Sequence, residues 1–398
     1  MRKDKIIDIL NKTIEWSLYI LVFSIPFSKT AIEACILVAS IAWISKKVLT
    51  KDFSLKKTPI NTALFAFFII SAISIINADF KMMAMRALVS KCLKYIFLYF
   101  IVIESVDSER KFKNLLKVAF VSAVIVMIDS YLQYYVLHKD IFRSRVPFKY
   151  RQNFKGDSLV LGFPTGPFPF PNDLSAWMLI ILLPALSLFI WQVTKRSTKF
   201  ILGLFLAPFL FLFYLANTRA AWFGFVISFF ALIFVRKRKL LTLFLVMFLV
   251  ALLIMFFFLP GERMGSIFGF LSWWDRVYMW RISWNVFMEH PIIGNGINMF
   301  YGKFKEFRED KYTGLLGSYA HNGFLQIAAD IGIMGLAIFL LIIGKVLKRG
   351  FTSRANPLAL GMAAGLSAFL IHSFFDTNLQ SLPLASFFWL SMALLMSL

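Results

Sequence analysis

The chain has 398 residues, of which 59% are hydrophobic and 16% charged, and its formal net charge is +22. Soluble globular domains contain about 45–50% apolar and about 25% charged residues, so this composition excludes an ordinary soluble protein and indicates an integral membrane protein. The apolar runs are continuous rather than alternating, which excludes a membrane β-barrel and predicts a bundle of helices. The two cysteines, Cys35 and Cys92, provide neither a disulfide framework nor a metal-binding spacing.

The predicted helices begin with a retained N-terminal span, because no signal-peptide cleavage site follows its charged and then apolar sequence. A helix needs about 20 mostly apolar residues to cross a bilayer. By this criterion we expect one transmembrane domain, residues 1–398, with about twelve spans. The spans are predicted at 14–28, 30–45, 59–78, 88–105, 116–137, 173–193, 200–216, 219–235, 240–259, 321–344, 357–375 and 381–398.

The loops between these spans differ in their content of basic residues. One set, which includes "KKVLTKDFSLKK", "DSERKFKNLLK" and "RKRK", is denser in Lys and Arg than the other set. The positive-inside rule predicts that the denser set and both termini are cytoplasmic. Two long loops, 138–172 and 260–320, would then lie on the opposite face. The apolar pattern of 276–288 in the second loop predicts a short helix at the membrane interface.

The first long loop is rich in basic side chains, and two interpretations of them stay open. Basic residues near a membrane are attracted to anionic lipid headgroups by about 1 kcal/mol each. Alternatively, they bind a phosphorylated or acidic glycan. The candidates are Arg143, Arg145, Lys149 and Arg151.

Three arginines on the same predicted face are stronger candidates. Arg219 begins the span 219–235, where a snorkelling side chain is the structural alternative. A guanidinium group also binds a diphosphate well, because it offers a rigid fork of donors. Arg276 and Arg281 lie in the second long loop, where an ion pair with a nearby acid is the alternative. They are about 140° apart on a helix, so we do not expect both to contact one ligand group.

His321 begins the span 321–344 within "AHNGFLQ". A histidine here is either a cap or interface residue, or a general base, since its ordinary pKa is about 6.5. Asp330 is about 180° away on the same helix, so we expect it to bond to a neighbouring span rather than to His321. His372 and Asp376 are spaced closely enough to pair. The sequence contains no phosphate-binding glycine loop and no metal motif, so we expect no metal ion and no other cofactor.

Four stretches in order resemble the O-antigen ligase and polymerase superfamily of bacterial envelope glycosyltransferases. They are "GPFPFPNDLSAWMLIILLPAL", "NTRAAW", "DRVYMWRISWNVFMEHPIIGNG" and "HNGFLQIAADIGIMGL". The resemblance rests on motifs within residues 160–340 and extends to the rest of the chain by architecture. It implies a multi-pass protein of the bacterial inner membrane, with a GT-C-like bundle, two long periplasmic loops and a metal-independent periplasmic active site.

The resemblance also implies substrates and roles for individual residues. The donor would be a glycan on undecaprenyl diphosphate, and the acceptor would be a sugar hydroxyl of lipid A-core. Arg219 and Arg276 would bind the diphosphate and His321 would be the general base, with inversion at the anomeric carbon. Arg281 follows as a further substrate-binding residue, and Tyr319 and Asn322 would position the sugar or the base. Membrane lipids are expected partners, and nucleic acids are not.

Four other functions stay open on the sequence. Two are enzymes of the same superfamily, an O-antigen polymerase and a protein O-oligosaccharyltransferase. A solute transporter is a different class, which usually places its substrate at the membrane midplane beside broken helices. A non-catalytic scaffold is the fourth.

Overall fold

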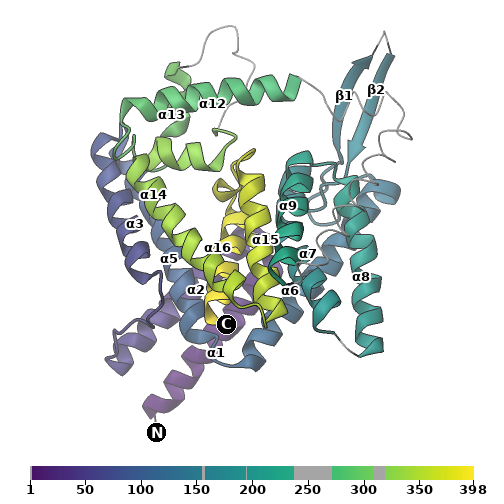
Figure 1. Ribbon diagram of the computed structural model, residues 1–398. Helices are drawn as coiled ribbons and strands as arrows, with labels where there is room; N and C mark the ends of the chain where they lie inside the picture. Colours follow the sequence, from purple (N-terminus) through teal and green to yellow (C-terminus); the bar gives the residue numbers. More distant parts are fainter. Residues whose placement is uncertain (1, 155–156, 194, 237–270, 308–318) are drawn as a thin grey trace.

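The computed structural model describes residues 2–154, 157–193, 195–236, 271–307 and 319–398 (Figure 1). The predicted span 240–259 and parts of the predicted loop 260–320 lie outside these residues. The described elements are α1 (Arg2–Ser24), α2 (Lys29–Thr50), α3 (Asn61–Ile73), η1 (Ser74–Asn77), α4 (Lys81–Ala87), η2 (Leu88–Leu93), α5 (Lys94–Ser105), α6 (Glu109–Leu132), η3 (Gln133–Leu137), β1 (Phe148–Phe154), β2 (Asp157–Phe163), α7 (Pro171–Trp191), α8 (Arg196–Leu215), α9 (Arg219–Arg236), α12 (Leu271–Glu289), α13 (Phe300–Phe307), α14 (Gly323–Thr352), α15 (Pro357–Ser373), η5 (Asn378–Gln380) and α16 (Leu382–Ser397).

Every predicted span within the described residues coincides with a helix or with consecutive helices. In this part of the chain, five helical segments are long and apolar enough to cross a membrane: Glu109–Leu137, Pro171–Trp191, Arg196–Leu215, Arg219–Arg236 and Gly323–Thr352. Three further apolar helices are shorter: Asn61–Asn77, Pro357–Ser373 and Leu382–Ser397. The prediction of a helical, multi-pass membrane protein is therefore confirmed. The number of crossings stays a prediction.

One segment departs from the all-helical prediction. Strands β1 and β2 form an antiparallel hairpin inside the predicted loop 138–172 (Figure 1). Their register pairs Phe148 with Phe163 at the open end and Phe154 with Asp157 beside the turn. The segment carries Tyr, Val and Phe on either side of Lys155-Gly156, a combination that favours a hairpin over an irregular loop. The interpretation of this segment from the sequence rests on its basic side chains and does not consider its strand propensity.

Side chains at the helix starts fix where several helices begin. Ser28 caps α2 by accepting a hydrogen bond from the backbone N–H of Ala31 at 3.2 Å. Asn356 caps α15 in the same way, and Pro357 follows as its first residue. Such caps satisfy N–H groups that have no partner inside the helix. The sequence therefore sets the turn between α1 and α2 and the turn between α14 and α15.

Helix α15 lies between α7 and α9, and glycines bring the three backbones close together. A Cβ on Gly361 of α15 would lie 2.7 Å from Cα of Pro184 in α7. A Cβ on Gly224 of α9 would lie 2.5 Å from the carbonyl oxygen of Ala368 in α15. Small residues at helix contacts of this kind are typical of membrane bundles. This packing holds the start of α7, the start of α9 and the end of α15 in one place, where the candidate site lies.

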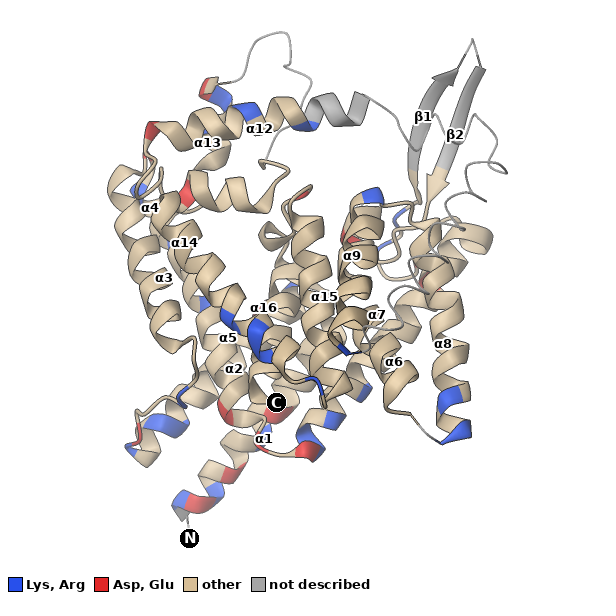
Figure 2. Ribbon diagram, in the orientation of Figure 1, with Lys and Arg blue, Asp and Glu red and all other residues tan. Residues whose placement is uncertain are grey.

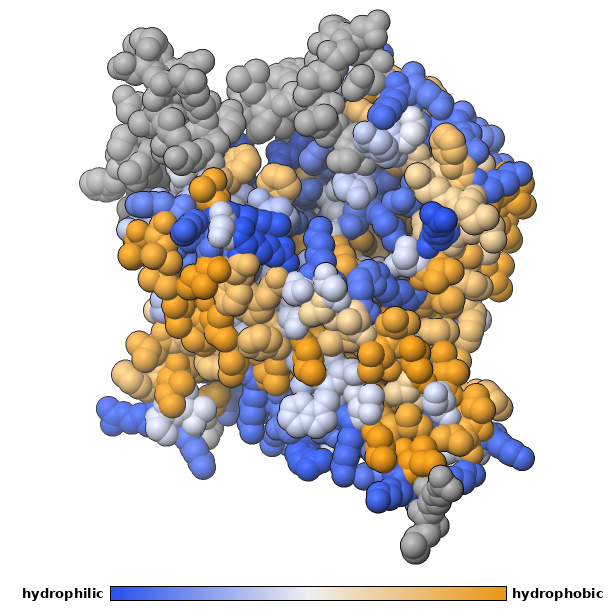
Figure 3. All heavy atoms as spheres, turned by 180° about the vertical axis from the view of Figure 1, so that it is seen from behind, coloured by the Kyte–Doolittle hydropathy of each residue, from blue (hydrophilic) through white to orange (hydrophobic). Residues whose placement is uncertain are grey.

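The outer surface fits a protein surrounded by lipid. Hydrophobic atoms form a belt across the middle of the face in Figure 3, with hydrophilic atoms above and below it. Large apolar side chains point outward from α2 and α8, among them Leu37, Ile41, Phe200 and Leu204. A water-soluble monomer rarely exposes apolar patches of this extent.

Helix α14 is broken at Ile331 and Gly332, and the segment 290–296 fills the break. Gly332 has φ of 70° and ψ of −179°, which ends the first part of the helix. Four hydrogen bonds join the two segments: Asn295 N to Ala329 O (3.0 Å), Gly296 N to Asp330 O (3.0 Å), Ile333 N to Pro291 O (2.8 Å) and Met334 N to Ile292 O (3.3 Å). They replace the two helical bonds that an unbroken α14 would make here, so the exposed backbone groups stay paired.

We expect Gly332→Ala to destabilise the protein. A Cβ at this position would lie 2.2 Å from the carbonyl oxygen of Ile292, and the positive φ costs a residue other than glycine about 1–2 kcal/mol before any clash. The measurement is the apparent Tm of the purified protein in detergent. Gly344→Ala in the same helix is the matched control, because no heavy atom lies within 4 Å of its added Cβ. Equal Tm values for the two variants would contradict this account of the break.

Candidate active site

His321 lies in the turn directly before α14, two residues ahead of its first residue, Gly323. Its backbone is left-handed, with φ of 48°, and its carbonyl oxygen accepts a hydrogen bond from Nε1 of Trp280 at 3.1 Å. The next residue, Asn322, caps α14, and its side-chain oxygen accepts from the backbone N–H groups of Phe324 and Leu325. The imidazole is 46% exposed. These contacts fix the backbone of His321 and leave its ring accessible.

Asp376 is the acidic group that faces this ring. Its Oδ1 lies 3.7 Å from Nδ1 of His321, which is within ion-pair range and longer than a direct hydrogen bond. The backbone N–H of Thr377 donates to Oδ1 at 2.8 Å, and Nδ2 of Asn172 donates to Oδ2 at 2.8 Å. Burial alone would raise the pKa of Asp376, but His321, His372 and the backbone N–H of Thr377 hold it well below its ordinary value. Asp376 is therefore a carboxylate at neutral pH.

The backbone around Asp376 is tied to the start of α14. The N–H of Gly323 donates to the carbonyl oxygen of Asp376 at 3.0 Å. His372, which the sequence allowed to pair with Asp376, instead lies fully buried, with its Nδ1 at 2.7 Å from Nδ2 of Asn378. The carboxylate of Asp376 is thus directed to His321 and Asn172.

Polar contacts continue from Asp376 to the start of α9. Asn172 at the start of α7 accepts a hydrogen bond from Oγ1 of Thr218 at 3.4 Å, and Oγ of Ser175 donates to Thr218 at 3.0 Å. Thr218 directly precedes Arg219, which is the first residue of α9 and is exposed. Arg219 and His321 are 102 residues apart in the sequence, yet two hydrogen bonds and one ion-pair contact connect their neighbourhoods.

Arg276 reaches the same turn from helix α12, which crosses the top of the bundle in Figure 1. Its Nε donates to the carbonyl oxygen of Phe375 at 3.2 Å. One turn further along α12, the ring of Trp280 packs on those of Phe374 and Phe375, with centroids 5.7 and 6.3 Å apart. The residues of the predicted helix 276–288 lie within α12, and its position at the membrane interface stays a prediction. The contact brings Arg276 next to Asp376, as the third of the predicted catalytic residues in this region.

A buried lysine anchors the far end of α12. Nζ of Lys303 in α13 lies 2.9 Å from Glu289, 3.2 Å from Asp79 and 3.4 Å from Glu306. The lysine joins the last turn of α12 to the segment after η1 and leaves Glu289 engaged away from the arginines. Since this network around the buried ammonium connects three elements, it fixes the position of α12 over the bundle.

The other predicted substrate-binding residues are placed differently. Arg281 is exposed on α12 and makes no hydrogen bond or ion pair to other described residues, whereas Arg276 is half-buried. Arg143 donates through Nε and Nη2 to the carbonyl oxygen of Phe27, at 3.1 and 2.6 Å, and Arg145 donates to that of Pro167 at 3.2 Å. Both arginines therefore hold backbone turns. Lys149 and Arg151 lie in β1, and their side chains are outside the described residues.

Two more candidates have partners close to the site. Tyr319 is half-buried, and its ring centroid lies 5.6 Å from the ammonium of Lys91. Asp330 does not bond to a neighbouring span as expected. It accepts from Gln326 in its own helix at 3.1 Å and from the backbone of Phe300, at the start of α13, at 3.2 Å.

Two contributions were missed or undervalued in the sequence. Asn172 lies in the first of the motif stretches but carries no chemical signature of its own. Asp376 was noted only as a partner of His372, because helical spacing reports contacts along one helix and not between helices. Among the described residues, no group of three or more His, Cys, Asp and Glu side chains could hold a metal ion.

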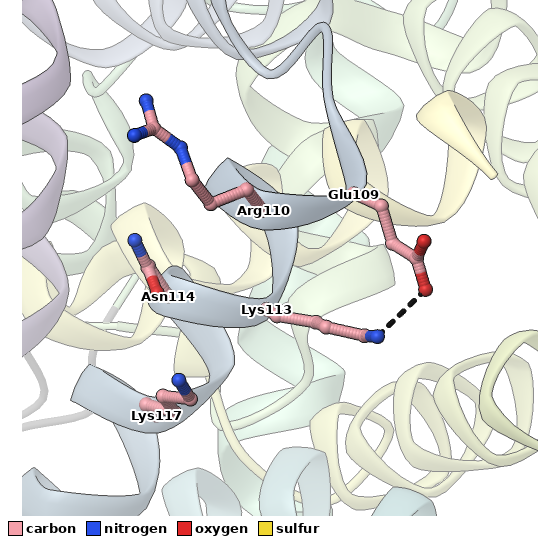
Figure 4. A pocket seen from close by; sticks show the side chains of 5 residues that line it. All are labelled: Glu109, Arg110, Lys113, Asn114 and Lys117. Atoms are coloured by element: carbon pink, nitrogen blue, oxygen red, sulfur yellow. Dashed lines mark ion pairs between the residues drawn. The ribbon is translucent and has the colours of Figure 1, made fainter.

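A surface depression elsewhere does not contribute to this site. It is lined by Glu109, Arg110, Lys113, Asn114 and Lys117, all on the first turns of α6 (Figure 4). Helix α6 has 24 residues, which is about 36 Å, and its other end approaches the segment before α7. The drawn ion pair, Glu109 with Lys113 at 2.7 Å, joins neighbouring turns of this exposed helix.

We expect Asp376→Asn to lower stability in a pH-dependent way. The lowered pKa means that the carboxylate stabilises the fold above its unfolded pKa of about 3.9, and that this contribution is lost as the pH falls through the folded pKa. At pH 7 the apparent Tm of the variant should lie below that of the wild type, and the difference should narrow below about pH 4. The surface pair Asp107–Lys111 supplies the control, Asp107→Asn, whose apparent Tm at pH 7 should stay close to that of the wild type. A gap between wild type and Asp376→Asn that widens in acid would contradict the assignment.

Comparison with known proteins gives one family and one relative. Residues 204–340 match the family described as O-antigen ligase. A stretch of 79 residues is 34% identical to the protein named "Putative polysaccharide ligase" of Rickettsia bellii (strain RML369-C), and it covers 19% of this chain and 19% of that protein. The family match contains Arg219, Arg276 and His321, whereas Asn172 and Asp376 lie outside it. Residues 204–340 of the chain are therefore similar to the O-antigen ligase family, and the match spans about a fifth of the length of the curated relative.

Proposed function

We propose that this protein is an O-antigen ligase that transfers a glycan from undecaprenyl diphosphate to a sugar hydroxyl of lipid A-core. The observation that carries the proposal is the meeting of His321, Asp376 and Arg276 beside the start of α9, in a chain that matches the O-antigen ligase family. An exposed imidazole with a carboxylate behind it and guanidinium groups beside it suits transfer from a diphosphate.

The distribution of charge supports a periplasmic site in the bacterial inner membrane. Lys and Arg gather at the lower end of the bundle in Figure 2, opposite to α12. Basic segments there include the start of α1, the end of α2, the start of α8 and the end of α14. By the positive-inside rule this end faces the cytoplasm. The site would then meet two substrates that are both anchored in the outer half of the membrane.

The proposed reaction is a direct displacement at the anomeric carbon. The acceptor hydroxyl oxygen forms a bond to this carbon while the bond to the diphosphate oxygen breaks, which inverts the configuration. The hydroxyl proton passes to His321, and the leaving diphosphate keeps the electron pair. Arg219 and Arg276 offset the negative charge that develops on it, because fixed donors need no reorganisation during the step.

Asp376 acts through His321 in this scheme. The scheme does not need Asp376 to contact the substrate. Its negative charge stabilises the imidazolium that forms when the ring of His321 accepts the proton. Nδ1 faces the carboxylate at 3.7 Å, so the opposite nitrogen, Nε2, is the one that would accept the proton from the acceptor. The half-buried hydrogen bond from Asn172 keeps the carboxylate in place.

A solute transporter is a second candidate, because α14 is broken at Ile331–Gly332 and transporters commonly bind substrates at broken helices. In this protein, backbone groups from residues 291–296 fill the break, which favours a structural explanation. Uptake of a solute into proteoliposomes, without glycosyl transfer, would favour the transporter. Products from purified donor and alternative acceptors would separate the ligase from a polymerase or a protein O-oligosaccharyltransferase.

We expect His321→Ala to lower glycan transfer by about 10²–10⁴-fold, the usual contribution of general base catalysis. The assay uses purified protein in liposomes with lipid-linked glycan and lipid A-core. His138→Ala is the matched control, because His138 is exposed at the end of η3 and outside the site. Near-normal turnover of a folded His321→Ala variant would show that the base is another group.

We expect Arg276→Gln to reduce transfer by about 10²-fold or more, as the loss of one donor to a developing oxyanion does. Arg276→Lys should restore little of it, since lysine lacks the planar fork of donors. Arg110→Gln, at the opposite end of the bundle, should transfer at the wild-type rate. The rate of glycan transfer should be unchanged when a chelator is added to the same assay. Loss of transfer in the chelator would show that the reaction needs a metal ion.

A further inference from the structure

Lys91 is a cation beside the candidate site that the proposed mechanism does not use. It lies in η2, a π-helical segment between α4 and α5. Such segments inside helices occur frequently at functional sites, because the extra residue redirects a side chain. The side chain of Lys91 is half-buried, and its ammonium donates to Oδ1 of Asn298 and to Oε1 of Gln380, both at 2.6 Å.

The partners of Lys91 are neutral, so they bind its ammonium without cancelling its charge. Among the described residues, no carboxylate lies within ion-pair distance of it. Asp330 acts on it through space, but Gln326 and the backbone of Phe300 already occupy that carboxylate. Lys94, three residues along, adds a second positive charge nearby and is itself paired with Glu33 at 2.8 Å. A desolvated charge without a direct counter-ion is costly, and an anionic ligand would remove that cost.

The surroundings of Lys91 belong to the segments that build the site. Gln380 lies in η5, directly after the turn that contains Asp376. The ring of Tyr319, two residues before His321, lies 5.6 Å from the ammonium. Asn298 has a left-handed backbone, with φ of 64°, and presents its side-chain oxygen to Lys91. Three separate segments therefore hold this cation on the α5 side of His321, while Arg219 and Arg276 approach from α9 and α12.

We propose that Lys91 binds a phosphate group of a substrate, as a further cation of the candidate site. This inference extends the proposed function, since it adds a binding residue to the same site. The phosphate has two possible sources, the diphosphate of the lipid-linked donor and a phosphorylated sugar of the acceptor. Tyr319 and Gln380 then serve to orient the ammonium between these groups and His321.

The experiment measures binding and does not depend on turnover. Purified full-length protein in detergent is titrated with farnesyl diphosphate and, separately, with glucosamine 6-phosphate, and the Kd is measured by thermophoresis. Lys91→Gln should weaken binding of one probe by about tenfold or more, the effect of losing one charged hydrogen bond. Lys91→Arg should restore most of the affinity. Lys94→Gln is the matched control and should bind like the wild type, because Lys94 already has an acidic partner.

Each result decides the proposal. Weaker binding of farnesyl diphosphate assigns Lys91 to the donor, and weaker binding of glucosamine 6-phosphate assigns it to the acceptor. Unchanged Kd values for both probes would overturn the proposal, as would equal losses of affinity and of Tm in Lys91→Gln and Lys91→Arg, which would make Lys91 a structural residue.

A second measurement needs no variant. Amine-reactive labelling of the wild type, read by mass spectrometry, should be slowed at Lys91 but not at Lys94 by the probe that binds, and equal labelling rates would overturn the proposal. Failure of the transfer assay with these binding results intact would refute the ligase function and leave the phosphate site standing.

Discussion

The turn after α15 holds the candidate site together, because three segments that are distant in sequence bond to it, in addition to the turn's own Thr377. Asn172 and Thr377 donate to the carboxylate of Asp376, Gly323 donates to its carbonyl oxygen, and Arg276 donates to the carbonyl oxygen of Phe375. The turn itself is positioned by the close packing of α15 against α7 and α9. Polar chemistry at the membrane surface thus depends on small residues deep in the bundle, which let three helix ends meet.

The break in α14 solves a related problem. A membrane environment penalises unpaired backbone groups, so a helix can be interrupted only where something else pairs them. The segment "HPIIGNG" pairs the backbone groups at the break with its own backbone groups. Gly294 and Gly332 allow this segment and α14 to approach closely. As a result, the first part of α14, which begins beside His321, is joined to α12 through the loop that follows it. His321 and Arg276 therefore belong to one connected unit.

Long apolar runs predicted the helices well, because a helix in lipid must be apolar along its whole length, and such a run is easily recognised in the sequence. The resemblance also predicted that Arg276 and His321 belong to one site, and the structure brings both to the same turn. Other features left no such record. Nothing local distinguishes Arg276, which reaches the site, from Arg143, which holds a backbone turn, because the difference lies in what packs opposite each residue. Asp376 was noted from its spacing to His372, but its contact is with His321 on another helix. The hairpin β1–β2 was missed because its charges drew more weight than its strand-forming residues.

Arg276 and Lys91 share one property that explains why their charge remains available. Arg276 donates to a carbonyl group and Lys91 to two side-chain amides, so neither has a direct acidic partner among the described residues. Lys303, by contrast, is surrounded by three carboxylates and serves only to anchor α12. Neutral acceptors can orient a cation without neutralising it, whereas an ion pair would have to be broken before an anion could bind. The acid that does lie in the site, Asp376, faces the imidazole instead. In the proposed mechanism, positive charge is therefore left for an anionic substrate, and negative charge is kept for the imidazole that would become positive during the reaction.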